Sequence, residues 1–116
     1  MEHEMKLQPA PFEKIRRGEK TVELRLYDEK RKTVAVGDSI RFIKVDSPTE
    51  TLTARVVELL VFPSFAELYA AVSLRDCGYS EYELANASPD DMDAYYSREE
   101  REKYGVVGIR LELIES

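Results

Sequence analysis

The chain has 116 residues, of which 43% are hydrophobic and 34% are charged, and its formal net charge at neutral pH is −6. This length and composition predict one globular domain over residues 1–116 with its own hydrophobic core, and they exclude a disordered chain. The overall acidity argues against a protein that binds polyanions across its whole surface.

The content of cysteine and histidine excludes further classes of site. The chain has one cysteine, Cys77, and one histidine, His3, which excludes a disulfide framework and a metal site built from several such residues. We expect no metal and no cofactor, and we expect His3 to lie in a mobile terminus. No apolar run approaches the roughly 20 residues of a membrane span, and Met1–Glu4 lacks the features of a secretory signal, so a cytoplasmic location is expected.

Charge is distributed unevenly along the chain. Residues 1–60 contain 12 basic and 11 acidic residues, whereas residues 61–116 contain 5 basic and 12 acidic residues. Ten basic and five acidic side chains fall within residues 14–44. This local excess predicts an anion-binding face, with a solvated charged surface as the alternative.

Hydrophobic alternation predicts four strands before residue 62, with a short helix between the first two. The expected strands are residues 3–7, 20–27, 39–45 and 51–61. The second has the clearest alternation of apolar and polar residues, typical of a half-buried strand. The helix over residues 12–17 follows Pro11 and is expected to end at Gly18.

After residue 62 the pattern changes to that of helices. Ser64–Glu67, Ser80–Glu83 and Ser97–Glu100 each have the Ser-x-x-Glu form of a capping box. Ser88 followed by Pro89 offers a further helix start. We therefore expect a helical insertion over roughly residues 64–104.

The last strand closes the expected fold. It covers residues 106–114, with Gly105 ending the preceding helix and Gly108 marking a bulge or a close backbone approach. This order of elements predicts the α+β class: a small, partly closed β-barrel of about five to six mostly antiparallel strands, with the helical insertion before the last strand.

The strand over residues 20–27 carries the strongest candidate site. One of its faces presents a hydroxyl, a carboxylate, a guanidinium and a phenol, from Thr21, Glu23, Arg25 and Tyr27. Such groups can hold a polar, planar ligand, and Lys20 lies at the start of the same strand. The alternative is an exposed strand face with a cross-strand ion pair.

Tyrosines supply the aromatic candidates, because the chain has seven tyrosines and no tryptophan. Tyr96 and Tyr104 fall in the helical insertion or at its exit, and either ring can stack on a base. The alternative is that they are amphipathic residues at the edge of the core. Cys77 lacks a histidine base, and we interpret it as a small core residue.

Residues 18–25 read Gly-Glu-Lys-Thr-Val-Glu-Leu-Arg and resemble the Gly-x-Lys-x-x-Glu-x-Arg motif of the ASCH domain family. The resemblance extends to the Gly-Asp turn and strand at Val36–Phe42 and to the closing segment Tyr104–Ile109. Tyr95-Tyr96-Ser97 resembles a segment of a small bacterial subgroup of that family. Together these matches cover nearly the whole chain.

The resemblance implies a PUA-like β-barrel with a cleft between barrel and helices, where ASCH domains are proposed to bind RNA or nucleotides. In this chain Lys20 and Arg25 would contact phosphate or carbonyl groups, and Glu23 would accept an amino group of a base. The basic residues expected to guide an RNA backbone, in a salt-dependent way, are Arg16, Arg17, Lys30, Arg31 and Lys32. Neither a membrane nor duplex DNA is an expected partner.

Some small bacterial relatives are amidohydrolases that remove the acetyl group from acetylated cytidine, and their catalytic motif lysine matches Lys20. The relatives have a threonine where this chain has Glu23. Their catalytic glutamate lies in the helical segment, where the nearby acids here are Asp76, Glu81 and Glu83. An amidohydrolase acting on a modified nucleoside through Lys20 and Glu23 is therefore the first alternative to an RNA- or nucleoside-binding domain. A protein-interaction scaffold is the second.

Overall fold

The computed structural model describes residues 1–88 and 96–115. In chain order, its elements are β1 (Glu2–Leu7), α1 (Pro9–Arg16), β2 (Val22–Leu26), the 3₁₀ helix η1 (Arg31–Thr33), β3 (Ser39–Lys44), β4 (Ser47–Phe62), α2 (Phe65–Ala71), α3 (Glu81–Ala85), α4 (Arg98–Tyr104) and β5 (Val106–Glu115).

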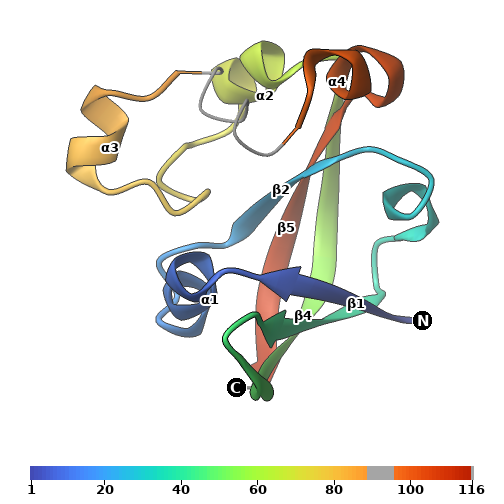
Figure 1. Cartoon of the computed structure of the whole chain (residues 1–116), viewed down its shortest axis with the longest axis vertical. Coiled ribbons are helices and arrows are strands. Elements are labelled where there is room, and N and C mark those ends of the chain that lie inside the picture. The colour runs from blue at the N-terminus through green and yellow to red at the C-terminus, as the bar shows by residue number, and fades with distance from the viewer. Residues whose placement is uncertain (89–95, 116) are drawn as a thin grey trace.

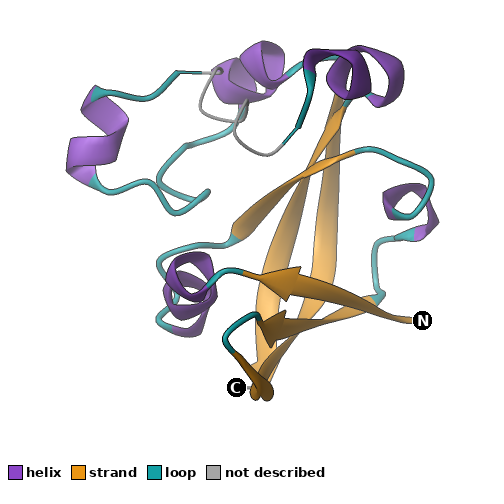
Figure 2. Cartoon of the chain, viewed as in Figure 1, coloured by secondary structure: helices purple, strands orange, loops and turns teal. Residues whose placement is uncertain are grey.

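The five strands form one sheet in the order β1-β3-β4-β5-β2, with β1 parallel to β3 and the other neighbours antiparallel. The long strands β4 and β5 change register twice along their pairing, and such bulges bend a sheet. The sheet curls into a half-barrel whose two edge strands are β1 and β2 (Figure 2). The predicted α+β class, with a helical insertion before the last strand, is confirmed.

Each face of the sheet packs against helices over part of its area. On one face the helix α1 contributes Phe12 and Ile15 to a core cluster with Phe42 and Ile109. On the other face α2 packs over β4 and β5. The second core cluster lies there and includes Val22, Leu24, Phe65, Leu68 and Val106. The helices α2 and α4 lie together at one end of the long strands, whereas α3 stands farther out on the side of α1 (Figure 1).

The polar face of β2 is not exposed to solvent, as the alternative interpretation of this strand would require. Its apolar residues Val22 and Leu24 pack under α2. Glu23 pairs in register with Ile109, and directly paired residues of antiparallel strands share a face, so its side chain points to the concave side with α1. Glu23 is only 4% exposed. The alternation of apolar and polar residues identified the two faces of β2. It did not show that helices cover both of them.

Local signals at the helix ends are largely confirmed. Ser80 and Ser97 each form a complete capping box with the glutamate three residues later, whereas only the serine side of the box forms at Ser64. Gly105 ends α4 with a φ of 72°. The helix start expected at Ser88-Pro89 lies at the edge of residues 89–95, outside the described part of the chain.

Three details differ from or refine the expectations. His3 does not lie in a loose terminus, since it belongs to β1 and its Nε2 is 2.8 Å from Asp38 Oδ2. β4 begins at Ser47, earlier than predicted, because Ser47 already pairs with Lys44 across a tight turn. Gly108 marks a close approach, since a Cβ there would lie 3.3 Å from Val22 Cγ1.

None of the helices in residues 1–88 and 96–115 combines the length and apolar character needed to cross a membrane.

Candidate functional site

The turn between α1 and β2 fixes the start of the site. Gly18 adopts a φ of 78°, which glycine tolerates without strain, and the chain reverses there. The backbone N–H groups of Glu19 and Lys20 both donate to Lys14 O, at 2.8 and 3.2 Å. The N–H groups of the next two residues donate to Asp76 O. These bonds hold Lys20 at the entry to β2, between α1 and the segment that precedes α3.

Three charged side chains of this segment form one ion-paired group. Lys20 Nζ lies 2.9 Å from Glu23 Oε1, and Arg25 Nε and Nη2 each lie 2.9 Å from Glu23 Oε2. The side chains of Lys20, Glu23 and Arg25 are 10%, 5% and 14% exposed. Arg25 Nη2 also donates to Lys6 O at 2.8 Å. Arg25 therefore links the two edge strands of the half-barrel, β2 and β1, which are not neighbours in the sheet.

The carboxylate of Glu23 is ionised in this group. Burial by itself raises the pKa of Glu23, but the charges of Lys20 and Arg25, together with their hydrogen bonds, outweigh burial and hold its pKa below the ordinary value. The wall of the site thus presents three groups in a row: the donor Lys20, the acceptor Glu23 and the donor Arg25.

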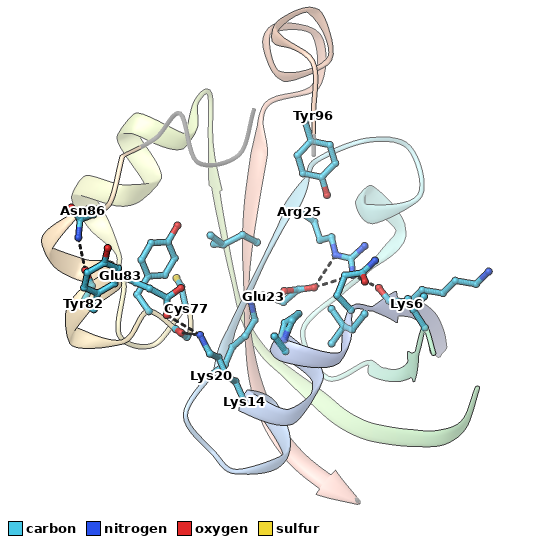
Figure 3. Close-up of a pocket in the computed structure, with 18 residues that line it drawn as sticks. Lys6, Lys14, Lys20, Glu23, Arg25, Cys77, Tyr82, Glu83, Asn86 and Tyr96 are labelled. Carbon is cyan, nitrogen blue, oxygen red and sulfur yellow. Dashed lines mark hydrogen bonds and ion pairs between the residues drawn. The ribbon is translucent and has the colours of Figure 1, made fainter. Parts of the chain in front are cut away.

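This group lines a cavity of about 780 Å³ between the half-barrel and the helical segment. The corner of β1 and α1 forms one wall, β2 forms the floor, and residues 77–86 form the opposite wall. Figure 3 shows Lys20, Glu23 and Arg25 across the middle of this cavity, with Lys14 and Glu83 at one side. Cavities of this size, with a few convergent polar groups, are the usual form of small-molecule sites.

Aromatic rings complete the lining. Tyr79, Tyr82 and Tyr96 all contribute to it, and Tyr82 on α3 is 80% exposed. The Tyr96 ring stacks on Phe65 with centroids 6.2 Å apart, and its hydroxyl points toward Arg25 (Figure 3). Tyrosine rings therefore line the helical side of the cavity.

Lys14 joins the opposite wall to α1, a role that the sequence did not suggest. Its Nζ donates to Gly78 O at 2.6 Å and to Glu83 Oε1 at 3.0 Å. A hydrogen bond from the Ser80 backbone and then the contact with Lys14 lower the pKa of Glu83. The capping box predicted the position of Glu83 beside Ser80, but no local signal pairs it with a lysine 69 residues away.

The structure brings together four of the seven residues expected in the ligand site. Lys20, Glu23, Arg25 and Tyr96 line the cavity, whereas Thr21, Tyr27 and Tyr104 do not contribute to its lining.

The other three residues take part in different contacts. Thr21 is held through its backbone, which bonds to Asp76 and Leu111. Tyr27 packs against the core on the α1 side, with Lys32 Nζ 5.7 Å from its ring centroid. Tyr104 ends α4 next to Lys103.

Most of the basic residues expected to guide RNA are paired with acids. Arg16 contacts Glu50, Arg17 contacts Glu19, Arg31 contacts Asp28, and Lys32 contacts Glu29. Lys30 has no ion pair within the described residues. The charge count over residues 14–44 includes Glu19, Asp28 and Glu29 but does not show which bases they pair with, and it leaves out Glu50.

The described residues hold no group of three or more His, Cys, Asp or Glu side chains that could bind a metal ion. Cys77 lines the cavity but is buried, and burial raises its pKa to about 11.

Comparisons with known proteins identify the fold family. The crystal structure of the hypothetical protein PH0355 is 34% identical to this chain with a TM-score of 0.80, over 98% of this chain and 100% of that one. The solution structure of PF0455 from Pyrococcus furiosus is 35% identical with a TM-score of 0.72, over the whole of both chains. A mutant of ZmASCH from Zymomonas mobilis shares the fold at 16% identity and a TM-score of 0.61, over 98% of this chain and 73% of that one.

A search among curated proteins finds no match. The family model described as ASCH domain matches residues 5–115. The chain therefore belongs to the ASCH domain family and has its PUA-like fold.

Proposed function

We propose that the cavity binds one nucleoside unit, free or within single-stranded RNA, and that Lys20, Glu23 and Arg25 contact the edge of its base. The observation that carries this proposal is a nearly buried, ionised carboxylate held between two cations on the wall of a cavity. Isolated buried charges are costly, so a pre-arranged row of this kind suits a polar ligand that completes its hydrogen bonds.

The row of groups favours a base that carries an exocyclic amino group. A carboxylate has about four acceptor sites, two on each oxygen. Two nitrogens of Arg25 contact Glu23 Oε2, whereas only Lys20 contacts Oε1 among the described residues, so Oε1 keeps a site for a ligand. Glu23 can therefore accept from an amino group, as carboxylates do with cytosine. The ammonium of Lys20 has three donors and can serve the adjacent ring nitrogen or carbonyl. Cytosine and adenine have this amino-beside-acceptor edge, whereas uracil has no amino group.

Tyr82 supplies a stacking surface for such a base. Its ring is on α3 at the rim of the cavity and is largely exposed. Stacking of a base on an aromatic side chain contributes about 1–3 kcal/mol and tolerates any sequence. A single unpaired nucleotide fits this arrangement, whereas a duplex would keep its bases out of reach.

Titration calorimetry with the four nucleosides, modified nucleosides and short single-stranded RNAs tests the proposal. We expect cytidine or adenosine to bind, and Lys20→Met to weaken binding at least about tenfold, since hydrogen bonds to charged groups contribute roughly 1.5–3 kcal/mol. Lys44→Met is the matched control, because Lys44 is also a half-buried, ion-paired lysine but lies outside the cavity. Equal losses of nucleoside affinity in Lys20→Met and Lys44→Met, or no binding of any of these ligands, would overturn the proposal.

A hydrolase acting on a modified nucleoside is the second candidate, favoured by the 2.9 Å contact between the motif lysine and a carboxylate at the cavity wall. In that reaction water adds to the amide carbonyl, the C–N bond breaks, and the products are a carboxylic acid and the amine. A base must take the proton of the water, and the lowered pKa of Glu23 makes it a weak base. We therefore expect acetylated cytidine to bind without conversion. Formation of cytidine by the protein, lost in Lys20→Met, would favour the hydrolase instead.

A further inference from the structure

We propose that the ligand carries a phosphate group and that this phosphate binds in a second cavity, on the far side of Arg25 from Glu23. This inference rests on the proposed function, and it specifies the ligand as a nucleotide rather than a free nucleoside.

The second cavity adjoins the first. It has a volume of about 310 Å³, and its lining includes Lys6, Arg25, Lys30 and Arg31. Lys6 and Arg25 line both cavities. The two cavities therefore share the wall where Arg25 bridges from β2 to the Lys6 carbonyl of β1.

The charges around this cavity favour an anion. Lys6 and Lys30 have neither an ion pair nor a side-chain hydrogen bond within the described residues, whereas each of the other nine basic residues of the 14–44 window has a carboxylate partner. Glu4 also lines the cavity, but its carboxylate pairs with Arg41. The two lysines without partners in this part of the chain thus lie on one small cavity, which leaves it with uncompensated positive charge.

Arg31 adds a donor that the fold leaves unused. Its Nη1 lies 2.8 Å from Asp28 Oδ2, but its Nε is buried and has no hydrogen-bond partner among the described residues. A buried N–H group without a partner is costly, and a rotation of the Arg31 side chain toward the cavity would let a bound oxyanion accept from it. Lysine and arginine donors together are the usual protein ligands of phosphate.

The order of the groups matches the layout of a nucleotide. Glu23, Arg25 and Lys6 follow one another across the gap between β2 and β1, and the Lys6 side chain extends away from Glu23 (Figure 3). A base held at Glu23 would place its sugar beside Arg25 and a phosphate at Lys6 and Lys30. A free nucleoside would leave this second cavity empty.

The test compares affinities by calorimetry for cytidine and adenosine and for their 5′- and 3′-monophosphates. We expect one of the two monophosphates to bind about tenfold more tightly than its nucleoside, with a gain that shrinks as salt is added. In Lys30→Met, the ratio of the nucleoside Kd to the monophosphate Kd should fall toward one. In the control Lys103→Met, which removes a lysine of α4 that lines neither cavity, the ratio should be unchanged.

Two outcomes would separate failure of this inference from failure of the proposed function. If the nucleosides bind but neither monophosphate binds more tightly, or if Lys30→Met keeps the gain, only the phosphate site is overturned. If neither nucleosides nor monophosphates bind, the proposed function fails and the phosphate site fails with it.

Discussion

Replacing Glu23 by glutamine removes the charge on which the ion-paired group depends, and we expect it to destabilise the fold. Glutamine keeps the shape of glutamate but has one oxygen and one NH₂ group. The oxygen can accept from Lys20 or from Arg25. The NH₂ group would then face the N–H donors of the other cation, so Glu23→Gln leaves two nearly buried positive charges without a counter-charge.

The size of the loss follows from the geometry. At 2.9 Å and an effective dielectric constant of 20, each ion pair of Glu23 contributes about 6 kcal/mol of Coulomb energy, offset by a desolvation cost of several kcal/mol for each ion. Removing one partner of a buried pair costs about 3–5 kcal/mol. Lys20 and Arg25 border an open cavity, where water can solvate them, so we expect about 2–3 kcal/mol. For a chain of this size, such a loss lowers the Tm by roughly 8–12 °C.

Urea unfolding of the two proteins measures this loss directly, and Glu58→Gln is the matched control. Glu58 pairs with Arg110 at the same 2.9 Å, but its side chain is 51% exposed. Exposed pairs contribute about 0–1 kcal/mol. If Glu23→Gln costs no more than Glu58→Gln, Glu23 is better solvated than the structure shows, and the reasoning about the buried group is refuted.

Three further predictions concern residues outside this group. Hydrogen bonds from His3 and the Ala35 backbone hold the pKa of Asp38 at about 2, below the ordinary 3.8. The contribution of the Asp38 carboxylate to folding stability is therefore present above pH 4 and is lost as the pH falls through 2. An NMR titration of the Asp38 carboxyl with a midpoint near 3.8 would contradict this. Burial raises the pKa of Cys77 to about 11, so a disulfide reagent at pH 8 should modify it far more slowly in the folded than in the urea-unfolded protein, and equal rates would speak against burial. Gly105→Ala would place a Cβ at a residue with a φ of 72°, only 2.9 Å from a backbone oxygen. We expect it to lower the free energy of unfolding in urea by about 2 kcal/mol or more, and a decrease below about 0.5 kcal/mol would refute the strain.

Much of the fold could be predicted from the sequence because its local signals agree with one another. Serine caps, the glycine at the end of α4 and the alternation in β2 are short-range patterns, and each has its counterpart in the structure. The grouping of Lys20, Glu23 and Arg25 could also be predicted from the sequence, since all three residues lie within six positions on one segment.

Long-range features of the site were not predictable in the same way. Alternation in β2 does not show that helices cover the second face of the sheet, so an exposed face for Glu23 stayed open as an alternative to the site. The contact between Lys14 and Glu83 joins residues that only the fold brings together. The expected RNA-guiding role of Arg16 and Arg17 rested on charge counts, which cannot reveal the acids that pair with them.

The location of ligand-induced shifts in ¹H–¹⁵N NMR spectra tests the proposed site most directly. On addition of cytidine or adenosine monophosphate, binding at the proposed site predicts saturable shifts concentrated in the amides of residues 20–25 and 77–83, with Lys6 and Lys30 affected by the phosphate. Shifts concentrated on α4 and the far ends of β4 and β5, or no saturable shifts at millimolar ligand, would contradict a nucleotide site at Lys20, Glu23 and Arg25.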